Sequence, residues 1–166
     1  MDIIAQLTSE LNRLQGLSSA TPVPVTFSES PGRSLELMFH SVDRLGCSLN
    51  QIRLTVPHLA QKTLGELRQW AEELCRKVTY LSEQLGPLEV DAVDRHVLIR
   101  STPPDRSATE TRYYEIQLQT LGGGQFCLKR YAAEKNPPQR SQVEFVLTHE
   151  TLKKLVLDLW DLAETT

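Results

Sequence analysis

The feature that most constrains the fold is an alternation of apolar and polar residues with a period of two, which returns in several short runs. It covers residues 35–40, 51–56, 88–92, 97–99, 113–119, 126–129 and 143–147. Successive side chains of a β-strand point to opposite faces, so this period is typical of strands with one buried and one wet face. We therefore predict an α+β fold, with a mostly antiparallel sheet and helices packed on one side of it.

Helical periodicity is clearest over residues 64–85. Thr63, followed three residues later by Glu66, fits a capping box, and Gly86-Pro87 is the matching stop signal. Apolar residues recur between these signals at steps of four and three, which places them on one helix face: Leu67, Ala71, Leu74, Val78, Leu81 and Leu85. Two further helices are predicted, over residues 3–15 and 149–164.

The chain has the length of one domain, with 166 residues. We expect a single α+β domain over 1–166, with an N-terminal helix within 1–16 and a Ser/Pro-rich linker over 17–33 that holds an edge strand at 23–27. The predicted order is α-β-β-α-β(4–5)-α, and a strand followed by a helix in both parts indicates two degenerate strand-strand-helix halves. The predicted core contains Leu67, Leu74, Leu81, Ile116, Leu118, Phe126, Leu128, Phe145, Leu155 and Leu159.

Composition excludes several classes of protein. A hydrophobic fraction of 40% and a charged fraction of 23% are ordinary for a globular chain. The net charge of -3 argues mildly against a protein that binds nucleic acid mainly through positive charge, although a local basic patch fits an acidic chain. There is neither a long apolar run nor a basic leader, so we predict no membrane span and no secretion signal. The three cysteines are far apart and odd in number, which indicates reduced thiols and a cytoplasmic location.

Signals of catalysis are weak throughout the sequence. His149-Glu150 begins like a zinc-protease helix, but Lys153 stands where the second histidine is required. The glycines at 122–124 precede a strand rather than a helix, so they predict a hairpin turn instead of a phosphate loop. We therefore predict no catalytic, cofactor-binding or metal-binding residues and favour a non-catalytic protein. An enzyme whose residues converge only in three dimensions is the second alternative.

The last predicted helix is apolar on more than one face. Besides its main stripe it carries Leu157 and Trp160, which widen the apolar surface sideways. A helix that covers one side of a sheet needs a single stripe, so the excess indicates either a deeply buried helix or a subunit interface. Our first hypothesis is accordingly a non-catalytic protein-interaction or structural module, a homo-oligomer or a partner of another protein, with Leu157 and Trp160 at the interface.

The outer face of the predicted sheet supports a different function. If the apolar residues of its strands point inward, then Arg100, Tyr113, Lys129 and Tyr131 point outward together. Aromatic rings between cations are typical of proteins that bind single-stranded nucleic acid, because bases stack on the rings and phosphates meet the cations. The alternative is an ordinary solvated sheet face, which the acidic Glu115 on that face favours, as does Glu144.

The same strands resemble a known family. Residues 112–118, the glycines and residues 125–130 together resemble the strand-turn-strand of PUR-type repeats. Like the whirly proteins, those repeats place several antiparallel strands before a helix and bind single strands, so the resemblance implies the same kind of ligand. It covers at most residues 112–164, and it departs from the family in the length of the glycine turn and in the low charge of the chain.

Overall fold

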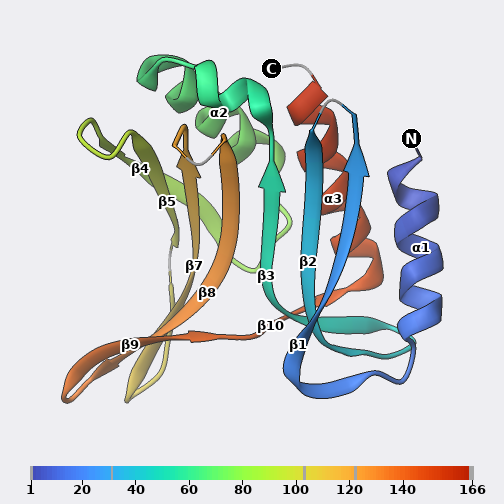
Figure 1. The fold of residues 1–166 in the computed structure, drawn as a ribbon. Helices are drawn as coiled ribbons and strands as arrows, with labels where there is room; N and C mark the ends of the chain where they lie inside the picture. The colour runs from blue at the N-terminus through green and yellow to red at the C-terminus, as the bar shows by residue number, and fades with distance from the viewer. Residues whose placement is uncertain (1, 31, 103, 122, 165–166) are drawn as a thin grey trace.

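The computed structural model describes residues 2–30, 32–102, 104–121 and 123–164 (Figure 1). Its helices are α1 (Ile3–Leu14), α2 (Leu64–Lys77) and α3 (His149–Glu164), with a short 3-10 helix η1 (Pro57–Gln61). Its strands are β1 (Ser18–Glu29), β2 (Arg33–Val42), β3 (Gly46–Thr55), β4 (Gln84–Asp91), β5 (His96–Thr102), β6 (Asp105–Arg106), β7 (Glu110–Gln119), β8 (Gln125–Lys135), β9 (Pro138–Val143) and β10 (Phe145–Thr148). The predicted α+β class is confirmed.

All strands belong to one antiparallel sheet with the main order β1-β2-β3-β8-β7-β5-β4. The two halves of the chain meet at its centre, where Ile52 of β3 pairs with Leu128 of β8. The inward side chains of these strands are buried, and the ring of Trp70 on α2 meets Phe126 edge to face at 6.3 Å. Helices α2 and α3 both contact this side of the sheet, and α1 packs on α3.

The sheet forks below its centre, and this fork shapes the face opposite the helices. β3 and β8 pair with each other only over residues 52–55 and 125–128. Beyond that point β10 pairs with β3 and β9 pairs with β8. Figure 1 shows β9 and β10 running across the lower end of the sheet, where β9 forms a long hairpin with β8. This hairpin adds a further strand beside β8.

Several predictions of local structure are confirmed. The last helix spans His149–Glu164, as the sequence predicts, and the first ends one residue earlier than expected, at Leu14. Thr63 and Glu66 form both hydrogen bonds of the capping box. Each of the ten residues predicted for the core is buried, with at most 8% of its surface exposed.

The helix predicted over residues 64–85 is shorter than expected, because α2 ends at Lys77. Val78 begins a segment with β-branched and aromatic residues, which have low helix propensity. Tertiary contacts then fix this segment in a non-helical conformation. The hydroxyl of Tyr80 donates to Asp158 on α3 at 2.7 Å, and Glu83 forms a buried ion pair with Arg130. Gly86-Pro87 falls within β4 rather than at a helix end.

The Ser/Pro-rich linker predicted over residues 17–33 is also wrong, because most of it is β1. This strand is longer than the edge strand predicted at 23–27, and it pairs with β2 on one side only. Prolines are tolerated on an edge strand because the missing N–H would face solvent there. Of the glycines predicted to form a turn, Gly123 and Gly124 lie in the β7–β8 connection, whereas Gly122 lies outside the described residues.

Candidate functional site

The candidate site lies on the sheet face opposite the helices, on strands β3, β5, β7, β8 and β9. Because side chains alternate along a strand, burial of Ile116 and Leu128 on the helix side sends their neighbours to the other side. We call this surface the open face, and its residues are Arg53, Arg100, Tyr113, Glu115, Lys129, Tyr131 and Arg140. It contains all four residues that the sequence predicted for nucleic-acid binding.

Two tyrosines and two arginines form a continuous row across the open face. Tyr113 and Tyr131 are cross-strand partners, and their rings stack with centroids 6.0 Å apart and an interplanar angle of 29°. The guanidinium of Arg140 lies 4.0 Å from the centroid of the Tyr131 ring, and that of Arg100 lies 5.8 Å from the Tyr113 ring. We call these four side chains the tyrosine row. A cation is attracted to the face of an aromatic ring, so the contacts of Arg140 with Tyr131 and of Arg100 with Tyr113 stabilise the row.

Glu115 holds the two arginines of the row in place. Its carboxylate accepts a hydrogen bond from Arg140 at 2.7 Å and lies 3.8 Å from Arg100, and its side chain is only 9% exposed. Arg140 also donates to the hydroxyl of Tyr113 at 3.2 Å. This hydrogen bond to Tyr113 and the charge of Glu115 both raise the pKa of Arg140, which stays charged. Glu115 therefore lies beneath its two cations, and the guanidinium groups face the solvent.

Two more cations extend the open face toward the centre of the sheet. Arg53 on β3 pairs with Glu36 at 3.6 Å and keeps 43% of its side chain exposed. In the described part of the chain, no carboxylate lies within 4.0 Å of the Lys129 amine. Around these residues, four cations against the carboxylates of Glu36 and Glu115 leave a local excess of two positive charges, although the whole chain carries a net charge of -3. Glu89 and Asp91 add negative charge to the same side of the sheet at its far edge, on β4.

Arg53 and Arg140 were not predicted from the sequence. Arg140 follows two prolines in a segment without clear alternation, and only its pairing with β8 brings it to Tyr131. Arg53 lies on an alternating strand, but the sequence does not show that this strand is next to β8. The acidic Glu144, which counted against a binding face, is exposed between β9 and β10 and lines a different hollow with His40.

The two residues predicted for an oligomer interface differ in exposure. Trp160 is buried, with 2% of its surface exposed, and the guanidinium of Arg33 covers its ring at 4.0 Å. Leu157 is 41% exposed. Trp160 therefore belongs to the core, and only Leu157 offers surface to another subunit. The homo-oligomer stays a prediction.

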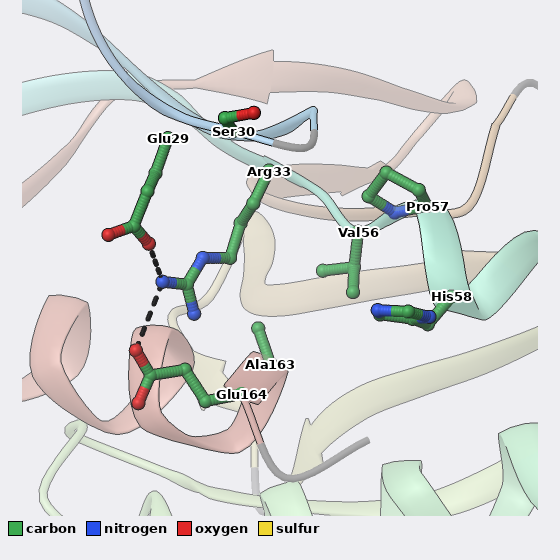
Figure 2. Close-up of a pocket in the computed structure, with 8 residues that line it drawn as sticks. All are labelled: Glu29, Ser30, Arg33, Val56, Pro57, His58, Ala163 and Glu164. Atoms are coloured by element: carbon green, nitrogen blue, oxygen red, sulfur yellow. Dashed lines mark hydrogen bonds and ion pairs between the residues drawn. The ribbon is translucent and has the colours of Figure 1, made fainter.

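Away from the open face, a cavity of about 200 Å³ at the end of α3 brings several ionisable groups together (Figure 2). Arg33 binds the carboxylates of Glu29 and Glu164 there, the latter at 3.0 Å, and donates to the carbonyl of Trp160 at 3.2 Å. The opposite wall is formed by Val56, Pro57 and His58. Because both carboxylates bind Arg33, they are poorly placed to act as an acid–base pair.

Asp91, Asp94 and His96 form a small cluster at the β4–β5 turn, with ligand atoms within 4.8 Å of one another. They are not among the residues that the sequence pattern marks as metal ligands. Asp91 accepts hydrogen bonds from the backbone N–H groups of Asp94 and Val93, which lower the pKa of its carboxyl. These bonds fix the turn without an ion, and all three side chains lie at least partly in solvent.

Comparison with protein-family models gave no match, and comparisons with curated proteins and with solved structures gave none either. The resemblance to PUR-type repeats thus rests on the sequence alone, over at most residues 112–164. Among the described helices, none combines the length and the apolar character needed to cross a membrane.

Proposed function

We propose that this protein is a non-catalytic nucleic-acid-binding domain that contacts the phosphate backbone with its open face. One observation carries the proposal: two stacked tyrosines, with an arginine against each ring, share with Lys129 and Arg53 a sheet face that α1, α2 and α3 do not cover. Phosphate contacts from arginine and lysine supply most of the affinity of sequence-independent nucleic-acid binding. A local excess of positive charge is sufficient for such contacts on a chain that is acidic overall.

The arrangement of the cations favours an extended polymer over a single small anion. Arg100 lies on β5, Lys129 on β8 and Arg53 on β3, and neighbouring strands are about 4.8 Å apart, so these cations spread over about 15 Å. Arg140 lies on the far side of β8, on β9. Cations at this spread do not converge on one phosphate, whereas successive phosphates of a strand lying across the sheet meet them in turn.

The test is a fluorescence-anisotropy titration of labelled oligo(dT) and oligo(U) in a series of salt concentrations. Four phosphate contacts predict a slope of log K against log salt of about -2.8 for a single strand, which is about a 50-fold loss of affinity between 50 and 200 mM salt. The double variant Arg100→Gln with Lys129→Gln should lower the slope to about -1.4. The matched control is Arg68→Gln, since Arg68 is an exposed, paired arginine on α2. Binding that is absent at low salt, or equal in the double variant and the wild type, contradicts the proposal.

A further inference from the structure

The two rings of the tyrosine row stack on each other, and Arg140 lies over the Tyr131 ring, so the faces of Tyr131 are covered in the free protein. Tyr131 contacts Tyr113 on one side and Arg140 on another, and both tyrosines are half-buried. A nucleobase stacks on the face of a ring, not on its edge. Stacking on Tyr131 therefore requires that a neighbour leave the ring, and the neighbours differ in how firmly they are held.

Arg140 is the neighbour that leaves most easily. It lies on β9, an edge strand that pairs with β8 alone, and its side chain is 44% exposed. Water replaces the hydrogen bonds of its guanidinium when it leaves, so the cost of departure lies mainly on its partner Glu115, whose side chain is only 9% exposed. Tyr113, in contrast, lies on β7, which is paired on both sides within the sheet.

Departure of Arg140 leaves no buried charge without a partner. Glu115 keeps Arg100 at 3.8 Å, so its carboxylate stays neutralised when Arg140 moves. The released guanidinium stays attached to the hairpin next to the ring, within reach of the phosphate of the nucleotide whose base has taken its place. Planar guanidinium groups and bases are also similar partners for an aromatic ring.

We infer that Arg140 is an exchangeable cover of Tyr131 and that the ligand is single-stranded, with one base replacing the guanidinium on that ring. The inference rests on the proposed function and goes beyond it, because phosphate contacts alone accept duplex and single strand alike. A paired base inside a duplex presents no free ring face, so only an unpaired base fills this position.

The experiment compares an octamer of dT with an abasic octamer that carries the same number of phosphates, and with an eight-base-pair duplex. The wild type should bind the dT octamer about fivefold to 150-fold more tightly than the abasic octamer, as expected for one stacked base. Tyr131→Leu should remove this preference and leave the abasic affinity within about twofold of wild type. Tyr131→Phe, which keeps the ring, should retain the preference, and thermal melting of each variant checks folding.

The outcomes separate the two proposals. Equal affinity of the wild type for dT and abasic octamers overturns base stacking while leaving the phosphate contacts of the proposed function. Tighter binding of the duplex than of the dT octamer likewise overturns the single-strand inference. A dT preference that persists in Tyr131→Leu places the stacked base elsewhere and overturns the role of Arg140. If neither octamer binds, the proposed function itself fails.

Discussion

Replacement of Glu83 by alanine should leave a buried arginine without its counter-charge. Glu83 and Arg130 form an ion pair at 3.0 Å, and their side chains are only 6% and 11% exposed. Ser101 also donates to Glu83, at 3.2 Å, and its hydroxyl accepts the backbone N–H of Tyr114 at 2.8 Å. The pair therefore joins the segment after α2 to strands β5, β7 and β8.

The size of the effect follows from this burial. Removal of one partner of a buried ion pair typically costs about 3–5 kcal/mol, because the other charge stays desolvated and unpaired. Arg130 also lies 4.4 Å from the ring of Tyr114, and this contact survives the change, so we expect the lower end of the range, about 3 kcal/mol. With a urea m-value of about 2 kcal/mol/M, the unfolding midpoint of Glu83→Ala should fall by about 1.5 M.

Equilibrium urea unfolding, followed by circular dichroism, measures this difference. The matched control is Glu110→Ala, because Glu110 pairs with Arg112 at 2.7 Å near the surface, with side chains 29% and 45% exposed, and that loss should stay below about 1 kcal/mol. The double variant Glu83→Leu with Arg130→Met should be more stable than Glu83→Ala, since it leaves no buried charge. If Glu83→Ala loses no more than Glu110→Ala, this reasoning about burial is refuted.

Three shorter predictions concern other parts of the chain. Gly124→Ala should destabilise the protein by at least 1 kcal/mol more than Gly123→Ala in urea unfolding. Both glycines have a positive φ, but only at Gly124 would an added Cβ clash with the backbone, at the carbonyl oxygen of Val56. Burial raises the pKa of Cys47 to about 12, so at pH 8 its thiol should stay protonated and resist a thiol reagent until the protein unfolds; fast labelling in the native state contradicts this. If the homo-oligomer forms through Leu157, sedimentation velocity should show a species heavier than the monomer, and Leu157→Asp should abolish it. A wild type that sediments as a monomer contradicts this prediction.

Local patterns predict most of the helices and strands, because alternation and helical spacing report which face of an element is buried. They fail where distant contacts decide the path of the chain. The helix signal of residues 64–85 continues past Lys77, yet Tyr80 and Glu83 bind partners on α3 and β8 that the local sequence does not contain. The prolines near residue 24 likewise suggest a linker, until the single-sided pairing of β1 with β2 explains why they are tolerated.

On the open face, too, local patterns predict which side chains point outward, whereas distant contacts decide which of them meet. Alternation predicts that Tyr113 and Tyr131 point away from the core, and the structure places them in contact. The contact of Arg140 with the Tyr131 ring could not be predicted from the sequence, because it depends on the pairing of β9 with β8. In the sequence, Glu115 favours an ordinary solvated sheet face, whereas the structure shows it buried beneath two arginines. Residues that depend on strand pairing therefore require the three-dimensional structure.

The most direct test of the central claim is an NMR titration of the ¹⁵N-labelled protein with the dT octamer, followed through its backbone amide signals. We predict shifts concentrated on β7, β8 and β9, above all at Tyr113, Tyr131 and Arg140, with signals around the Arg33 cavity unchanged. Shifts confined to that cavity or to the helices, or a spectrum that does not respond at low salt, would contradict the proposed binding face.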